Sequence, residues 1–197
     1  MSRWLEKLSL QCIQSGIITE DQLPWFIYGI EKRLSTLLTS IPFFLLAKLL
    51  TTPQCAVSMF LAFFLLRRRT SGYHAGSIGS CLFMSLLLEI AFFALIYPLL
   101  HLFTIILLLG ICTPIIYMFA PYRHPNMQFS DEEAYACQTS SRVNACTLAI
   151  GSVITYAAGL HEISKGLTIG IAMATILLCI AYILEWRNRN EQSEGNC

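Results

Sequence analysis

Long apolar stretches separated by short polar connections make up most of this sequence. Four of them approach the ~20 residues that an α-helix needs to cross a membrane: residues 78–100, 102–120, 143–160 and 166–184. Two shorter apolar runs, 34–50 and 55–66, precede them. The pattern alone does not decide whether these two runs each span the membrane or form a hairpin that enters and returns. It predicts an all-α polytopic membrane protein with about six membrane segments: four long spans and a shorter N-terminal hairpin or span pair.

The two ends of the chain follow other patterns. In residues 1–23, Trp4, Leu5, Leu8, Cys12 and Ile13 lie near the spacing of an amphipathic helix, and polar residues interrupt any signal-peptide core. Residues 190–197 are a polar tail. Because no repeat or linker divides the chain, we expect one domain over residues 1–197.

Composition supports the membrane class and excludes other classes. The chain is 55% hydrophobic and 13% charged, whereas soluble domains carry about 25% charged residues. A net charge of +1 argues against a nucleic-acid partner. The eight cysteines show no CxxC pair, and the chain contains neither HExxH nor GxSxG. We therefore expect no disulfide framework, no metal site and no cofactor.

The placement of basic residues predicts an orientation. Arginines occur in or beside every second connection: Arg67, Arg68, Arg69, Arg123, Arg142, Arg187 and Arg189. Because Lys and Arg accumulate on the cytoplasmic side, this alternation puts both termini and the loop around residues 67–77 on the cytoplasmic side of the plasma membrane.

One segment concentrates residues that are capable of chemistry. It begins with Arg67-Arg68-Arg69 and ends at Cys81, with His74 seven residues before the cysteine. A continuous helix would separate the two by ~10 Å, too far for a thiol–imidazole hydrogen bond. Three glycines disfavour such a helix: Gly72, Gly76 and Gly79.

We therefore expect residues 72–79 to break helical geometry and a helix to begin near Ser80. Cys81 would then lie in its first turn, where unpaired backbone N–H groups favour a thiolate. A turn after His74 would bring the imidazole within the ~3 Å that a nucleophile–base pair requires. The residues alone leave open whether the two form this pair or are an interfacial histidine and a buried thiol.

The same segment resembles the signature of the accessory gene regulator B (AgrB) family, membrane peptidases that process quorum-sensing propeptides. The matching residues are Arg67, Arg68, Gly72, His74, Ala75 and Cys81. Two further stretches are similar to family segments: Tyr28–Leu34, where Glu31 stands at a recurrent Glu or Gln position, and Ala120-Pro121 with its polar loop. The resemblance covers most of the chain.

The resemblance implies a cysteine endopeptidase in which Cys81 is the nucleophile and His74 the general base, then the general acid. Its substrate would be an AgrD-like propeptide with an amphipathic leader and an acidic tail. Cleavage through a thioester acyl-enzyme would promote ring closure to a thiolactone or lactone. Glu31 either orients His74 or gates the site, unless it only forms an interfacial ion pair.

Substrate-binding residues are expected in the same segment. Arg67, Arg68 and Arg69 would pair with acidic residues of the tail or with membrane lipid phosphates, beside Gly72 of the signature; a purely topological role for the arginines is the alternative. The loop after Pro121 departs from the family pattern, because it carries Asp131-Glu132-Glu133 where members often have lysines. Capture of the substrate by a basic loop is therefore not expected here.

Glu89 is the remaining ionisable residue inside a long span. It lies eight residues after Cys81, ~12 Å deeper along a helix. We expect it to form an interior hydrogen bond or to contact a second copy in a homodimer, which the sequence leaves open.

The alternative function is that of a non-enzymatic small membrane transporter or scaffold. Such a protein would place functional ionisable residues near the bilayer midplane of several spans. Here one such residue, Glu89, lies in the long spans, and the polar features concentrate at one membrane border. The enzyme is therefore the preferred interpretation.

Overall fold

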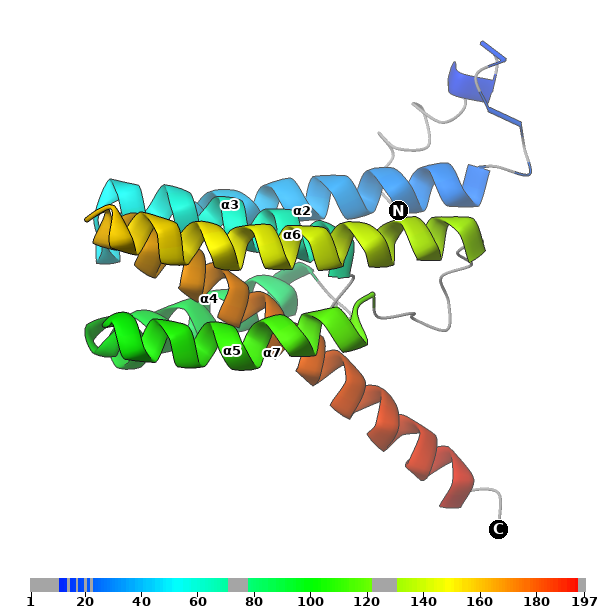
Figure 1. Ribbon diagram of the computed structural model, residues 1–197. Coiled ribbons are helices and arrows are strands. Elements are labelled where there is room, and N and C mark those ends of the chain that lie inside the picture. The colour runs from blue at the N-terminus through cyan, green and yellow to red at the C-terminus, as the bar shows by residue number, and fades with distance from the viewer. Residues whose placement is uncertain are drawn as a thin grey trace. The chain divides into compact units, whose positions relative to one another are not determined.

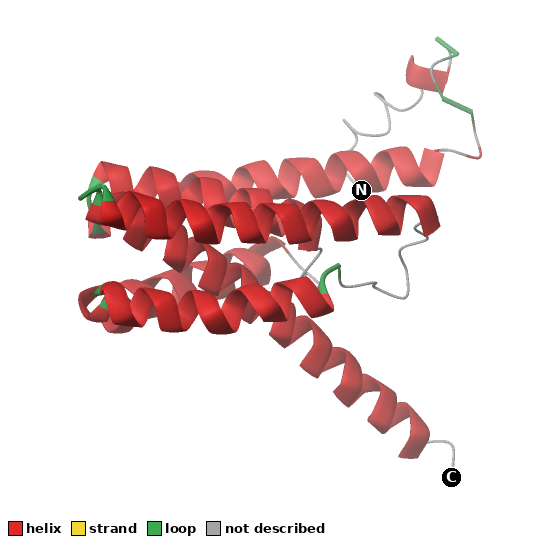
Figure 2. Cartoon of the chain, in the orientation of Figure 1, coloured by secondary structure: helices red, strands yellow, loops and turns green. Residues whose placement is uncertain are grey.

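The computed structural model describes residues 11–13, 15–16, 18–19, 21, 23–70, 78–121 and 131–194. Within these ranges all regular secondary structure is helical (Figure 2), which confirms the all-α prediction. The helices are α2 (Leu23–Leu50), α3 (Pro53–Thr70), α4 (Ile78–Ala91), α5 (Leu102–Phe119), α6 (Asp131–Ala157) and α7 (His161–Glu194). α4 continues into a π-helical segment, η2 (Phe92–Ile96), and a 3-10 turn, η3 (Tyr97–Leu99).

The chain divides into two compact units, Met1–Pro42 and Phe43–Cys197, and the boundary falls inside α2. The first unit holds the N-terminal part of α2. The second unit holds the last turns of α2 and helices α3 to α7.

Three segments of the described chain are long and apolar enough to cross a membrane: Leu82–Leu99, Leu102–Phe119 and His161–Leu184. They correspond to three of the four long spans expected from sequence. The fourth, 143–160, lies mostly in α6, which begins at Asp131 and carries acidic and polar residues along its first turns. α2 contributes only the short apolar stretch Ser40–Leu50, and α3 ends in three arginines. The count of about six spans is therefore not confirmed.

Polar contacts tie three connections together at one end of the second unit. Glu162, in the first turn of α7, accepts hydrogen bonds from Tyr97 Oη at 2.6 Å and from Thr52 Oγ1 at 3.1 Å. Lys165 Nζ lies 3.0 Å from Glu162 Oε1 and 4.9 Å from the centroid of the Tyr97 ring. These four residues, the Glu162 cluster, join the α2–α3 turn, η3 and α7. In the ribbon of Figure 1, the α2–α3 turn and the start of α7 lie at the same end of the second unit.

The basic end of α3 lies away from this cluster. α3 begins next to Thr52 and runs through its 18 residues to Thr70. α4 runs back, because it continues into η3, which contains Tyr97. Arg67–Arg69 and Cys81 therefore lie at the opposite end of the unit from the Glu162 cluster.

α3 and α7 pack closely because two glycines of α7 face α3. A Cβ at Gly166 would meet Ser58 Oγ and the carbonyl oxygen of Cys55. A Cβ at Gly170 would lie 2.6 Å from the carbonyl oxygen of Met59. Small residues four apart allow helix backbones to approach within a membrane, so this glycine seam sets the α3–α7 distance.

α6 and α7 are joined by buried hydroxyl groups. Ser152 Oγ lies 3.0 Å from Ser164 Oγ and 2.9 Å from Thr168 Oγ1, and it donates to the Ser164 carbonyl oxygen at 3.1 Å in an alternative hydrogen-bonding arrangement. All three side chains are fully buried. Each buried hydroxyl therefore has a partner, as a low-dielectric interior requires.

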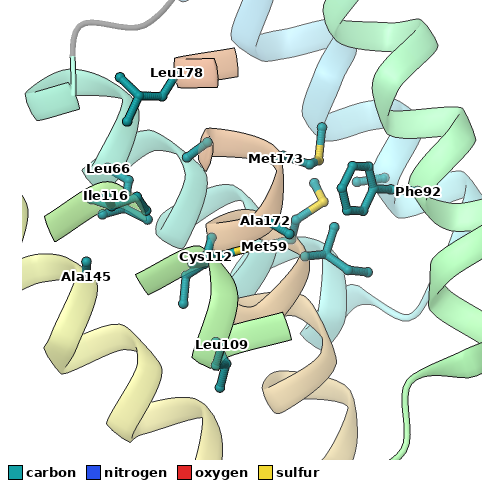
Figure 3. Close-up of a cluster of buried hydrophobic side chains, with 14 of the residues drawn as sticks. Met59, Leu66, Phe92, Leu109, Cys112, Ile116, Ala145, Ala172, Met173 and Leu178 are labelled. Carbon is teal, nitrogen blue, oxygen red and sulfur yellow. The ribbon is translucent and has the colours of Figure 1, made fainter. Parts of the chain in front are cut away.

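The apolar core lies among α3, α5, α6 and α7, and Phe92 of η2 joins it beside Met173 (Figure 3). On α4 the exposed apolar side chains Phe83, Leu87 and Ile90 follow the i, i+4, i+7 spacing of one helix face. This face suits contact with lipid, whereas Glu89 and Phe92 are buried on the inner side.

Candidate functional site

The three arginines expected to bind substrate form the last turn of α3. Arg68 is exposed, whereas Arg67 and Arg69 are half-buried. Cationic side chains are favoured at a helix C-terminus because the unpaired carbonyl groups there carry partial negative charge. Thr70, which ends the helix, is buried, and its Oγ1 has no hydrogen-bond partner among the described residues.

Cys81 is the fourth residue of α4, which begins at Ile78. The expected helix near Ser80 is present, and Cys81 lies in its first turn. Residues 78 and 79 belong to this helix, so the expectation that the break extends through Gly79 is wrong. The first four N–H groups of a helix lack intrahelical partners, and they favour the thiolate form of a cysteine.

The structure does not describe the side chains of the other residues predicted to form the site. Gly72 and His74 lie in the segment 71–77, which is outside the described residues. The backbone of Glu31 lies in α2, within the first unit, and its side chain is not described. The pairing of Cys81 with His74 and the role of Glu31 therefore stay predictions.

Glu89 is completely buried on α4, and neither of its carboxyl oxygens has a hydrogen-bond partner among the described residues. The expected interior hydrogen bond is therefore not present in this part of the chain. The inner position agrees with the sequence, since ionisable residues in membrane helices face the protein interior.

Two features of the described structure are not evident from the sequence pattern. The Glu162 cluster joins residues that are 110 and 65 positions apart, and its members read as ordinary interfacial polar residues. The second feature is the buried hydroxyl of Thr70, which has no hydrogen-bond partner among the described residues. Its position directly after the three arginines is the sequence feature that points to it.

The other described cysteines lie outside the first turn of α4. Six of them are free thiols, and two of these, Cys55 and Cys112, are buried. Cys55 lies in the first turn of α3, beside the Glu162 cluster: its backbone N–H donates to Thr52 Oγ1 at 3.3 Å. These thiols serve as matched controls for the chemistry of Cys81.

The three apolar segments that are long enough to cross a membrane indicate a helical membrane protein. Arg67, Arg68 and Arg69 form a basic group at the end of α3. A family model, Accessory gene regulator B, matches residues 2–182. The chain therefore belongs to the AgrB family, which places it in the processing of quorum-sensing propeptides. No match was found among curated proteins or among solved structures.

Proposed function

We propose that this protein is a membrane-embedded cysteine endopeptidase that cleaves an AgrD-like propeptide and promotes its cyclisation. The observation that carries the proposal is the position of Cys81. It lies in the first turn of α4, the helix that follows the basic end of α3 in the chain, and within the stretch matched by the family model.

The environment of Cys81 supports nucleophilic chemistry. A free thiol is mostly protonated at neutral pH, because its ordinary pKa is about 8.5. The N–H groups at the start of α4 favour the thiolate. His74, at the spacing of the family signature, would take the thiol proton and later deliver it to the leaving amine.

The reaction balances without a cofactor. The Cys81 sulfur attacks the carbonyl carbon of the peptide bond before the acidic tail, and the C–N bond breaks. The tail leaves with a new amino group, and the leader and ring segment remain on Cys81 as a thioester. A thiol or hydroxyl of the same peptide then attacks the thioester, which closes a thiolactone or lactone and restores the Cys81 thiol.

Two features would favour ring closure over hydrolysis. A site bordered by apolar helices limits the entry of water, which would otherwise hydrolyse the thioester. Transfer from one thioester to another is close to balanced in energy, so thiolactone formation needs no ATP. Glu31 would orient His74, or it would gate access to the site.

Substrate recognition is assigned to the basic end of α3. Arg67, Arg68 and Arg69 would pair with carboxylates of the acidic tail, because guanidinium groups form strong charge-assisted hydrogen bonds with carboxylates. Gly72 would let the connecting backbone approach the peptide. The alternation of basic connections puts this end on the cytoplasmic side of a multi-pass protein.

The test is co-expression with the cognate AgrD-like propeptide, followed by mass spectrometry of the peptide products. We expect Cys81→Ala to abolish cleavage, because no other group replaces the nucleophile. Cys55→Ala and Cys112→Ala should keep substantial activity. Normal processing by the Cys81→Ala protein at matched expression would refute the peptidase assignment.

A further inference from the structure

Glu89 is a buried acidic group with no role in the chemistry described above. Its side chain is fully inaccessible to solvent, and both carboxyl oxygens lack a hydrogen-bond partner among the described residues. Buried polar groups in native proteins almost always have partners. An ionisable group in a membrane helix with no partner among the described residues is therefore a candidate functional group.

The helix that carries Glu89 is also suited to a functional role. The close helix pairs of the second unit are formed by α3, α5, α6 and α7, and α4 is not among them. Directly after Ala91 the helix changes to the π-helical segment η2. Such segments are rare and are frequently found at functional sites.

Glu89 also lies at a useful distance from the proposed nucleophile. It is on the same helix as Cys81, eight residues later, which corresponds to ~12 Å. An extended peptide covers ~12 Å with three to four residues. A propeptide that lies along α4 with its scissile bond at Cys81 would therefore place a residue three or four positions away beside Glu89.

We propose that Glu89 binds a basic side chain of the propeptide inside the membrane and thereby positions the peptide along α4. This inference depends on the proposed function, because it takes the propeptide as the ligand. Two free carboxyl oxygens match the paired donors of a guanidinium or the three donors of an ammonium group. Phe83, Leu87 and Ile90 form the exposed face of α4, which suits lipid, whereas Glu89 is buried on another face. A lipid molecule is therefore not the partner that we propose for Glu89.

The test measures binding of the fluorescently labelled cognate AgrD-like propeptide. The protein is the full chain in nanodiscs with Cys81→Ala, which prevents turnover. We expect Glu89→Leu and Glu89→Gln to weaken binding about tenfold or more, as loss of a charged hydrogen-bond partner does. Without peptide, Glu89→Leu should melt at the same or a higher temperature, since an unpartnered polar group has been removed.

Thr113→Val is the matched control. Thr113 Oγ1 is also buried in a span without a partner among the described residues, but it lies on α5. We expect this variant to keep the affinity of the parent for the propeptide. If Glu89→Gln and Thr113→Val bind the propeptide equally well, the proposal is overturned even where the wild type cleaves normally.

A double-mutant cycle identifies the partner. Each Lys and Arg of the propeptide is replaced with Ala and tested against the parent and against Glu89→Gln. We expect one basic position whose loss costs the parent about tenfold in affinity and costs Glu89→Gln almost nothing. If each replacement lowers the affinity by the same factor in the parent and in Glu89→Gln, Glu89 does not bind a basic side chain. Cleavage by the wild-type chain, measured in parallel, reports separately on the proposed function.

Discussion

The half-buried carboxylate of the Glu162 cluster has several partners, whereas the buried carboxyl group on α4 has none among the described residues. At the cluster, one carboxylate accepts hydrogen bonds from Tyr97 and Thr52 and pairs with Lys165. On α4, the carboxyl of Glu89 is fully buried and has no partner among the described residues. Both groups are acidic, and both lie in segments apolar enough to cross a membrane.

This difference distinguishes the helices of the scaffold from α4, the helix that carries the proposed nucleophile. Hydroxyl pairs between α6 and α7 and the glycine seam between α3 and α7 hold these three helices in one arrangement. α4, which carries Cys81 and Glu89, lacks such ties to its neighbours in the described structure. Elements that bind or act on a ligand are drawn from the less stable parts of a protein.

The largest effect should come from the glycine seam. In Gly170→Leu, the new Cβ would lie 2.6 Å from the Met59 carbonyl oxygen, and backbone atoms cannot yield as a flexible side chain does. We expect a destabilisation of at least ~3 kcal/mol, seen as loss of the monodisperse peak in fluorescence-detected size exclusion. Gly151→Leu is the control, because nothing lies within 4 Å of a Cβ there. Equal losses in the two variants would contradict the seam.

A smaller effect is expected at the Glu162 cluster. Glu162→Gln removes the ion pair with Lys165 and leaves one acceptor oxygen for the donors of Tyr97 and Thr52. We expect a loss of about 1–3 kcal/mol and faster alkylation of Cys55, the buried thiol next to Thr52. Maleimide labelling of a variant with Cys55 as its only cysteine measures this rate.

Glu132→Gln controls for the loss of charge, since Glu132 is exposed on α6. It should leave both the melting temperature and the Cys55 labelling rate unchanged. If Glu162→Gln also leaves both unchanged, the cluster does not hold this end of the unit together.

The smallest effect sharpens the comparison between paired and unpaired hydroxyl groups. Ser152→Ala removes one hydrogen-bond partner from each of Ser164 and Thr168 and should lower the free energy of unfolding by about 1 kcal/mol. Thr70→Val removes a buried hydroxyl that has no partner among the described residues and should change stability by less than ~0.5 kcal/mol. Thermal melts in nanodiscs compare the two, and an equal loss would show that Thr70 is paired.

Hydrophobic pattern predicted the apolar helices well and the partly polar ones poorly. α5 was expected at 102–120 and extends over Leu102–Phe119. α6 was expected at 143–160 but begins at Asp131, because its first turns are polar and carry no apolar signal. The Glu162 cluster was not predictable, since its contacts join positions far apart in sequence. Of the site, the sequence correctly put Cys81 in the first turn of a helix.

The most direct test of the central claim is the mass of the acyl-enzyme. The full chain in nanodiscs is mixed with the propeptide, quenched in acid and digested, and the peptides that carry each cysteine are analysed by mass spectrometry. The account predicts an adduct on the peptide containing Cys81 that equals the N-terminal cleavage fragment minus one water, and that hydroxylamine removes. Cleavage at the normal rate with no such adduct on Cys81, or with the adduct on another residue, would contradict the account.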